Sequence, residues 1–493
     1  MGTNTKVCNS CFTDTFLKRV IRKNGQTSQC DYCGETRRAL DLESVADLFE
    51  SVFNAHYKRT PSGPSAFEEA MLHHGLSDMW YREGQPVLDV IQEVGGCAEE
   101  VAKGIRETLD LRHSTRDAYE MGYETEFDSE SHYDWRQVGS GELDAEWSVF
   151  EHSLKSESRY FSRTAMRMLE KVFHDLSTHR TYQGGSVIVD AGPNAELKSL
   201  YRARVFQSDR SLLAAIERPE VSIGPPPPRI AGAGRMNARG IPVFYGATAP
   251  EVALAEVRPP VGSKVVVARF DIIRPLRLLD VEALQNVSVA GSLFDPMYLD
   301  RSQKAAFLRG LSERITVPVM PEGEALDYIA TQVIAEYLAS LEDPSIDGMI
   351  YPSVQVAKGM KNVVLFHKAA VVAPVNRPSD VKFVVSDHEH YEEGPQIEYI
   401  VREEFDSEAA IPPKEPELRD LILDTSADPD PREPALELSK DKVRVHHIQG
   451  VEISSKSFTV NRDAFDKKDF REFKERQDQQ QKRISESLGD IEF

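Results

Sequence analysis

Two closely spaced cysteine pairs constrain the first 40 residues of the chain more than any other feature. Cys8-x-x-Cys11 and Cys30-x-x-Cys33 are separated by eighteen residues, a spacing typical of a tetrahedral zinc site with four thiolate ligands. A segment of this length buries too little apolar surface to be stable alone, and a bound metal compensates for the missing core. We therefore predict a zinc ribbon over residues 1–40 that holds structural Zn²⁺.

Four unmetallated thiols and a redox dithiol are the alternatives, although one pair would suffice for a redox dithiol. Asn24-Gly25 predicts a hairpin-like turn between the two pairs. Basic residues surround the site, and they are either a solvated surface or a contact for nucleic acid or an acidic partner: Lys18, Arg19, Arg22, Lys23, Arg37 and Arg38. Because the whole chain carries a net charge of −21, nucleic-acid binding is expected only at the ribbon.

The bulk composition indicates a folded protein without a membrane anchor. The chain has 493 residues, of which 40% are hydrophobic, enough for two to four domains. It contains no run of 18 apolar residues and no signal-peptide pattern. A cytoplasmic location, with no membrane partner, is the expectation.

The stretch from Gly234 to Arg258 is the strongest candidate for chemistry. A glycine-rich loop holds two cations, Arg235 and Arg239, and a short apolar strand after it contains Tyr245. A proline then opens a helix, in which Glu256 stands among apolar residues. Because a buried carboxylate is costly unless it is paired or has a task, Glu256 is the expected catalytic group.

This stretch closely resembles the RES family, named for an Arg, a Glu and a Ser. The family pattern is roughly "GRWN-x-x-G-x-P-x-x-Y" followed by "E-x-A-L-A-E", and Met236 here replaces the usual Trp, an aromatic wall of the pocket. "LYRARVF" (Leu200–Phe206) resembles the opening arginine motif, and "DGMIYPSVQVAKGMKNVVLF" (Asp347–Phe366) resembles the closing serine motif. The resemblance covers residues 198–375.

RES proteins are best known as toxins that destroy NAD, and their fold is similar to that of ADP-ribosyltransferases. Cleaving the nicotinamide–ribose bond needs cations for the pyrophosphate, an aromatic clamp for nicotinamide, and a carboxylate for the oxocarbenium-like charge on the ribose. The resemblance implies catalytic roles for Arg202, Tyr245, Glu256 and Ser353. It implies NAD binding by Arg202, Arg235, Arg239 and Tyr245.

Each of these residues also has a structural alternative. The arginines could pair with surface carboxylates, and Arg204 could share or replace the role of Arg202. Tyr245 could be a core aromatic residue, and Ser353 a turn or cap residue. Asn362 fits a local structural hydrogen bond better than a catalytic role.

The function expected from the resemblance is an NAD-degrading enzyme, a toxin or abortive defence effector. Inorganic phosphate or water is the acceptor, which makes it an NAD phosphorylase or a glycohydrolase. The alternatives are an ADP-ribosyltransferase acting on a macromolecule, and a non-catalytic zinc-ribbon protein that binds or senses a partner. A separate regulatory protein or a homo-oligomer could restrain the activity.

The expected fold class is multidomain α+β, because strands and helices mix without regular alternation. After the ribbon we predict a helical domain over residues 41–185, similar to modules related to HEPN domains. Arg167 and His174 there loosely fit the spacing of HEPN ribonucleases, but helix-surface or core polar contacts are the simpler interpretation. The RES catalytic domain would span 198–375, and an acidic extension 376–493, with a linker and a charged helix.

Overall fold

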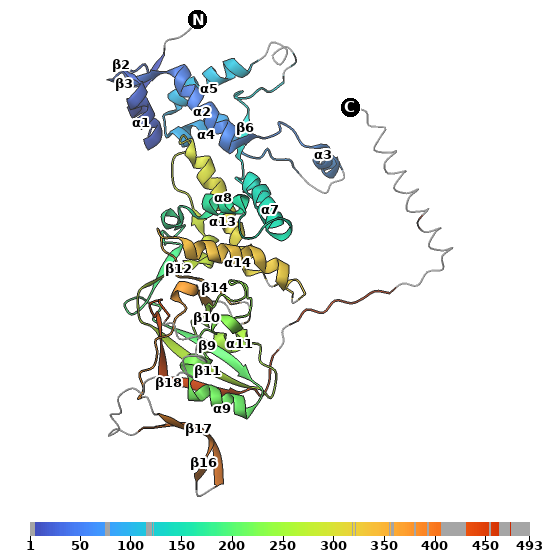
Figure 1. The fold of residues 1–493 in the computed structure, drawn as a ribbon. Coiled ribbons are helices and arrows are strands. Elements are labelled where there is room, and N and C mark those ends of the chain that lie inside the picture. The colour runs from blue at the N-terminus through green and yellow to red at the C-terminus, as the bar shows by residue number, and fades with distance from the viewer. Residues whose placement is uncertain are drawn as a thin grey trace. The chain divides into compact units, whose positions relative to one another are not determined.

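The computed structural model describes most of the chain. The described residues are 5–73, 79–114, 121, 123–317, 319–320, 322–353, 355, 359–378, 381–391, 394–405, 430–452, 455–462 and 474. The chain divides into Met1–Ile448 and Gln449–Phe493, and Figure 1 shows the ribbon. Among the described residues, no helix has the length and apolar character that crossing a membrane requires.

The first part of the chain combines a small sheet with helices. The sheet, in the order β1-β3-β2, is made of β1 (Lys6–Cys8), β2 (Gln26–Gln29) and β3 (Thr36–Asp41). The helices are α1 (Thr15–Asn24), α2 (Leu42–His56), α3 (Ala66–His73), α4 (Val87–Gly95) and α5 (Glu99–His113). A second sheet, in the order β4-β6-β5, is made of β4 (Tyr57–Arg59), β5 (Gln85–Pro86) and β6 (His132–Trp135).

The prediction of a hairpin at Asn24-Gly25 is wrong, because this dipeptide ends helix α1. Asp14 caps the start of α1 through a hydrogen bond from the Leu17 backbone N–H to its Oδ1 (2.7 Å). The N–H of Gly25 donates to the carbonyl of Ile21 (2.8 Å) and closes the last turn. The buried Leu17 and Ile21 are four residues apart, and this helical period decides the local structure.

The core of the N-terminal helices includes a residue from much later in the chain. Phe294 is 6% exposed, and its ring meets Phe49 edge-on, with 4.9 Å between the ring centroids. Next to it, the hydroxyl of Ser292 donates to Oδ1 of Asp14 (2.9 Å), the capping residue of α1. A loop of the predicted catalytic region therefore completes the N-terminal core.

Helices α7 (Gly141–Ser156) and α8 (Arg163–Phe173) pack with later elements rather than with this core. They share one hydrophobic cluster with α13 (Met297–Thr316) and α14 (Glu324–Ser340). The ring of Trp147 in α7 lies 5.2 Å from that of Phe307 in α13. These contacts join residues on the two sides of residue 185. The domain boundary expected there stays a prediction.

A central sheet has the strand order β18-β11-β9-β10-β15-β14-β12-β8 (Figure 1). The strands are β8 (Ile188–Ala191), β9 (Ser199–Phe206), β10 (Phe244–Ala247), β11 (Lys264–Ile272), β12 (Leu276–Asp280), β14 (Gly348–Pro352), β15 (Lys361–Leu365) and β18 (Leu436–His447). In the described part of the chain, β12 and β14 run parallel and the other neighbours antiparallel. Such a mixed sheet agrees with the expected mixed helix and strand class.

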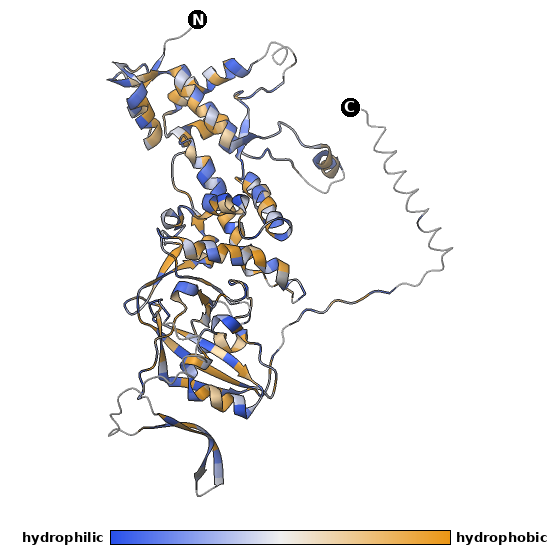
Figure 2. Ribbon diagram, viewed as in Figure 1, coloured by the Kyte–Doolittle hydropathy of each residue, from blue (hydrophilic) through white to orange (hydrophobic). Residues whose placement is uncertain are grey.

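Helices cover both faces of the central sheet. Helix α9 (Asp209–Glu217) packs on one face, in a cluster that contains Phe244 and Phe270. Helices α13 and α14 and the short α11 (Pro250–Glu256) pack against the other face. Figure 2 shows hydrophobic residues concentrated in the central strands and in α14, which is the pattern of a sheet buried on both sides.

Both edge strands of this sheet come from outside the predicted catalytic region. β8 lies between the predicted helical domain and the predicted catalytic domain, and β18 lies in the predicted acidic extension. β18 pairs with β11 from Leu436–Ile272 to His447–Lys264, and Leu436 is fully buried. The predicted acidic extension therefore contributes a strand to the central sheet.

A separate hairpin consists of β16 (Lys382–Tyr391) and β17 (Gly394–Glu404). The minor elements are η1 (Asn9–Cys11), η2 (Leu176–Thr178), β7 (Arg180–Thr181), α10 (Pro219–Ser222), η3 (Pro228–Ile230), α12 (Val281–Leu284), β13 (Val287–Ser288) and η4 (His367–Ala369). The predicted linker before Arg432 and the predicted C-terminal helix lie almost wholly outside the described residues.

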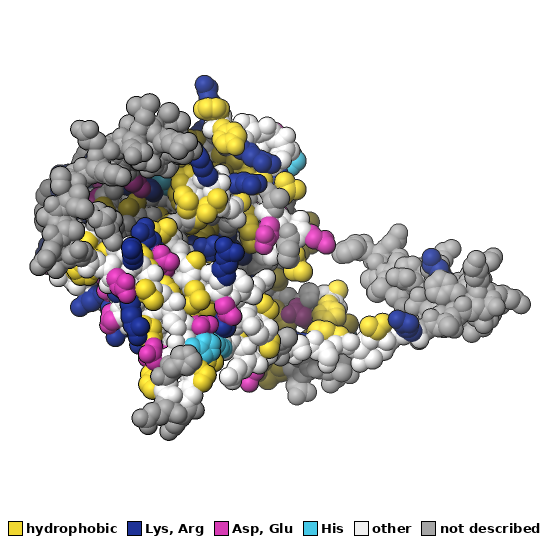
Figure 3. Space-filling view, turned by 60° about the horizontal axis from the view of Figure 1, so that its bottom comes forward, with side chains coloured by type: hydrophobic (Ala, Val, Ile, Leu, Met, Phe, Trp, Pro, Cys, Tyr) yellow, Lys and Arg dark blue, Asp and Glu magenta, His cyan; other side chains and the backbone are white. Residues whose placement is uncertain are grey.

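One face of the molecule, drawn in Figure 3, mixes charges of both signs. Lysine and arginine side chains alternate there with aspartate, glutamate and apolar side chains. On this face, the described part of the chain thus offers no continuous basic surface of the kind that nucleic-acid binding requires.

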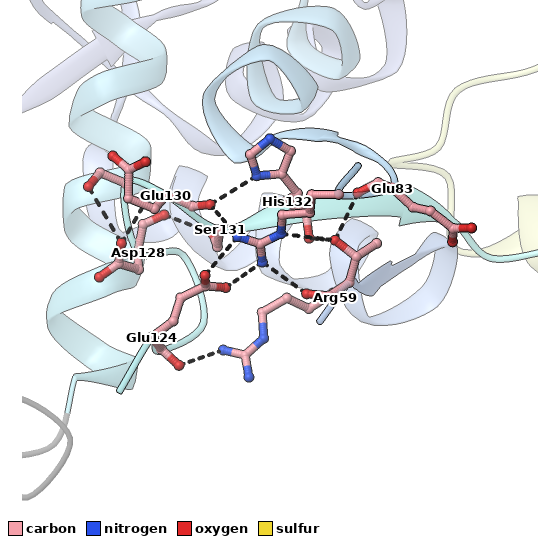
Figure 4. A network of polar contacts seen from close by, with 10 residues as sticks. Arg59, Glu83, Glu124, Asp128, Glu130, Ser131 and His132 are labelled. Carbon is pink, nitrogen blue, oxygen red and sulfur yellow. Dashed lines mark hydrogen bonds and ion pairs between the residues drawn. The ribbon is translucent and has the colours of Figure 1, made fainter. Parts of the chain in front are cut away.

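A partly buried ion pair stabilises the second N-terminal sheet (Figure 4). Nη1 and Nη2 of Arg82 donate to Oε2 and Oε1 of Glu124 at 2.8 and 2.7 Å, and the two side chains are 14% and 15% exposed. The same guanidinium donates to the carbonyls of Glu130 (2.7 Å) and Thr60 (2.9 Å). It therefore ties the segment before β6 to the end of β4.

We predict that Arg82→Ala loosens this sheet. Removing the guanidinium leaves a partly buried carboxylate and two carbonyls without their donor, which costs about 2 kcal/mol. Hydrogen exchange of the backbone amides of β6 should become correspondingly faster, and this readout does not require two-state unfolding of the whole chain.

Arg59→Ala is the matched control. Arg59 is exposed and makes one bond to the same segment, to the carbonyl of Glu124 (3.1 Å), so its loss should cost less than about 1 kcal/mol. Equal exchange rates in the two variants would contradict a central role for Arg82.

Candidate functional site

A cavity of about 280 Å³ opens where β9 and β10 meet. The ladder between these two fully described strands consists of the single pair Ala247–Tyr201. The cavity is lined by Tyr201, Arg202, Ala203, Tyr245, Gly246, Ala247, Ala253, Glu256, Val257, Tyr351 and Asn362. A sheet that has little pairing between two central strands leaves space for a ligand between them.

Glu256 is the acidic side chain of this cavity, and it is the last residue of α11. The helix begins at Pro250, as the sequence predicts, and Val252 and Ala253 bury its inner face. The expectation that Glu256 is buried is wrong, because the residue is exposed at the helix end. Its chemistry must therefore come from its hydrogen bonds rather than from burial.

Two side chains hold the Glu256 carboxylate by one oxygen. Nδ2 of Asn362 donates to Oε1 at 2.6 Å, and the Ser353 hydroxyl donates to the same atom at 2.9 Å. Asn362 is buried in β15, and Ser353 directly follows β14. Among the described residues no other bond reaches this carboxylate, so Oε2 is available to a ligand.

Tyr245 is half-buried in β10, and both functions of its hydroxyl are used. It donates to Oδ1 of Asn237 (2.8 Å) and accepts from the backbone N–H of Met236 (3.0 Å). Burial raises the pKa of Tyr245 to about 12, so the hydroxyl stays protonated at neutral pH. Tyr245 therefore connects the glycine-rich loop to the cavity wall.

Arg202 also lines the cavity, and one of its nitrogens is an unsatisfied donor. Nη1 is buried, and it has no hydrogen-bond partner in the part of the chain that the structure describes. Burial, followed by the charge of Arg204, lowers the pKa of Arg202 to about 10, which still leaves the guanidinium charged at neutral pH. A buried unpaired donor is costly, and an anionic ligand would relieve that cost.

A second cavity, of about 360 Å³, shares Tyr245, Glu256, Tyr351 and Asn362 with the first. It brings two cations toward Glu256. Arg235 donates to the carbonyl of Ile315 (2.6 Å), and its guanidinium lies over the ring of Tyr328, 5.5 Å from the centroid. Arg258 has a backbone φ of 44°, a conformation that costs about 1 kcal/mol or more in a non-glycine residue.

Arg239 lies outside the two cavities that contain Glu256, and its predicted role in binding NAD stays a prediction. Arg239 is exposed and lines a different groove. Arg204 is also exposed, and it donates to the carbonyl of Ser222 (2.8 Å). The sequence placed these arginines near the site by proximity along the chain, which does not fix the direction of a loop side chain.

Met236, at the position of the expected tryptophan, does not line either cavity. It is 2% exposed and belongs to the hydrophobic core with α13 and α14. The aromatic walls come instead from Tyr201, Tyr351 and Tyr328. Sequence reasoning missed these tyrosines, although Tyr351 stands two residues before Ser353 in the closing motif.

Four cysteines near the N-terminus form the candidate metal centre. The sulfurs of Cys8, Cys11, Cys30 and Cys33 all lie within 4.8 Å of one another. Three of the separations are 3.7 Å (Cys8–Cys11), 3.5 Å (Cys8–Cys33) and 3.6 Å (Cys11–Cys30). A tetrahedral zinc site with bonds of 2.3 Å gives about 3.8 Å between sulfurs. The thiols could therefore hold a metal ion and are compatible with structural zinc.

Comparison with known families agrees with the geometry. The RES domain matches residues 200–387, and the HEPN/RES N-terminal domain 1 matches residues 23–167. The chain is a long-form RES protein. RES domains are associated with NAD-related toxin activity, which indicates an enzyme that acts on NAD. No curated protein matches the chain.

The N-terminal match of this RES protein does not identify an RNA-cutting site. Arg167 lies in α8 and His174 is its C-cap, and both are exposed. No hydrogen bond or ion pair joins them among the described residues. The helix-surface interpretation of these two residues therefore remains the simpler one.

Proposed function

We propose that this RES protein degrades NAD by cleaving the bond between nicotinamide and ribose. The observation that supports this best is the Glu256 carboxylate, which Asn362 and Ser353 hold at the meeting point of two cavities. A fixed carboxylate can stabilise the positive charge that develops on the ribose as nicotinamide leaves. Its free oxygen faces no competing partner from the described chain.

The surrounding residues supply the other requirements of this reaction. Arg202, Arg235 and Arg258 provide guanidinium groups for the pyrophosphate, and guanidinium groups suit phosphate oxygens. Tyr245 and Tyr351 provide rings beside Glu256. Burial of Tyr351 raises its pKa, so its hydroxyl remains neutral beside the reacting sugar.

Asn362 and Ser353 act as positioning residues in this proposal. Because both donate to Oε1, they hold that oxygen in place and leave Oε2 toward the ligand. Inorganic phosphate is the proposed acceptor and water the alternative. Phosphate would give a phosphorylated ADP-ribose product that phosphorus NMR distinguishes from ADP-ribose.

The largely antiparallel sheet, with a cavity between β9 and β10, also supports the proposed likeness to the ADP-ribosyltransferase fold. The role of a toxin or defence effector, restrained by a regulatory protein or a second copy, is part of this proposal. Transfer of label from NAD to a macromolecule would instead favour the ADP-ribosyltransferase alternative.

We predict that Glu256→Gln lowers the rate of nicotinamide release from NAD at least 100-fold. The amide keeps the size of the side chain but cannot meet a developing positive charge. The measurement is chromatography of free nicotinamide after incubation of the full chain with NAD and phosphate.

Glu251→Gln is the matched control, since Glu251 is an exposed carboxylate in the first turn of the same helix. It should retain the rate of the unmodified chain. A Glu256→Gln protein that releases nicotinamide as fast as this control would contradict the catalytic role of Glu256.

For the N-terminal cysteines we propose a structural Zn²⁺ site. The expected zinc content of the purified chain is one ion per molecule, measured by mass spectrometry of the metal. Cys8→Ser should lose the ion, because Cys8 is fully buried among the other three thiols and a hydroxyl is a poor zinc ligand.

Cys97→Ser serves as the control for this substitution. Cys97 lies outside the cysteine cluster, so its replacement should leave the zinc content unchanged. Equal zinc content in the Cys8→Ser and Cys97→Ser proteins would contradict the assignment.

A further inference from the structure

A groove of about 560 Å³ runs along α14 beside the candidate site. Its lining includes Arg159, Tyr160, Arg239, Tyr328, Gln332 and Glu336. Arg159 and Tyr160 come from the loop between α7 and α8. That loop lies inside the HEPN/RES N-terminal match and outside the RES match.

The groove adjoins the cavity that contains Glu256. Tyr328 and Glu324 line both spaces, and the guanidinium of Arg235 lies over the Tyr328 ring. Helix α14 also holds the glycine-rich loop in place, since Nε2 of Gln332 donates to the carbonyl of Gly234 (2.8 Å). The first cavity, the second cavity and the groove therefore adjoin one another in this order, from the β9–β10 opening to the α7–α8 loop.

The size of the first cavity indicates that a dinucleotide needs more room. At about 280 Å³ it falls just below the range of about 300–1,000 Å³ that is usual for small-molecule sites. It suits the nicotinamide mononucleotide half, whose phosphate the Arg202 guanidinium in this cavity can pair with. The second cavity, with Arg235 and Arg258, suits the pyrophosphate. The groove adjoins this cavity and leaves room for the rest of the dinucleotide.

The chemistry of the groove fits a purine nucleoside. Tyr160 is 90% exposed, and an aromatic ring on a groove wall can stack on a base. Glu324 and Glu336 offer acceptors for ribose hydroxyls or an exocyclic amine, and Arg159 and Arg239 offer cations beside them.

We propose that this groove binds the adenosine half of NAD, with the α7–α8 loop as its outer wall. The inference rests on the proposed function and extends it. It makes the segment ahead of the RES match part of the substrate site, so that the enzyme favours a dinucleotide over a mononucleotide.

The test compares NAD with nicotinamide mononucleotide, which has the same scissile bond and no adenosine. Arg159→Ala and Tyr160→Ala should each raise KM for NAD about tenfold, a loss of about 1.4 kcal/mol. Their kcat with NAD and their kcat/KM with the mononucleotide should stay unchanged.

Phe161→Ala is the matched control, because Phe161 is 92% exposed and adjoins Tyr160 in the same loop but does not line the groove. It should behave as the unmodified chain with both substrates. Equal KM values for NAD in the Tyr160→Ala and Phe161→Ala proteins would overturn the proposal, as would a Tyr160→Ala effect of the same size on both substrates.

Binding of AMP, followed by saturation-transfer NMR, does not depend on catalysis. The full chain should bind AMP, Tyr160→Ala should weaken binding about tenfold, and Phe161→Ala should not. Absence of AMP binding overturns the groove assignment. AMP binding with this pattern, in a chain that releases no nicotinamide, supports the groove and contradicts the proposed reaction.

Discussion

The hydrogen bond from Asn362 to Glu256 is the interaction on which the site depends. The amide comes from a buried strand, whereas the carboxylate stands at an exposed helix end. A free glutamate at such a position would sample many rotamers, and the bonds from Asn362 and Ser353 restrict it to one. The central sheet thereby positions the Glu256 carboxylate, which the end of α11 alone would leave mobile. Stabilising a transition state requires charged groups that are held in place.

The N-terminal elements are part of the same folded unit as the catalytic region. Phe294 fills the core of the N-terminal helices, Ser292 contacts the cap of α1, and α7 and α8 share a core with α13 and α14. Strand β18 completes the other side of the central sheet from beyond the RES match. Phe294, three residues before the start of α13, thus belongs to the core of the N-terminal helices.

The sequence predicts the parts of this structure that depend on local pattern. The cysteine spacing predicts the four thiols that lie together, and Pro250 predicts the start of α11. The three ordered motifs supply Arg202, Tyr245 and Glu256, which line one cavity. The predictions that differ from the structure share one cause. A position in a motif does not fix where its side chain points. Glu256 was expected to be buried and is exposed. The substitution of Met236 for the usual Trp put one aromatic wall in doubt, and Met236 indeed lines neither cavity.

Other features depend on contacts between residues far apart in the chain. Tyr328 and Tyr351 reach the site because α14 and β14 pack beside the glycine-rich loop, and no periodicity in the sequence reports that packing. Strand β18 lies in an acidic segment, and its pairing with β11, which composition does not report, places it in the central sheet. Asn362 was assigned a local structural bond, and its partner proves to be the candidate catalytic carboxylate.

The most direct test of the central claim is the time course of nicotinamide formation by the unmodified full chain with NAD. The account predicts that nicotinamide appears in equal amount to the NAD consumed, together with a single ADP-ribose product. NAD that remains intact under these conditions, in a folded chain with its metal bound, would contradict it.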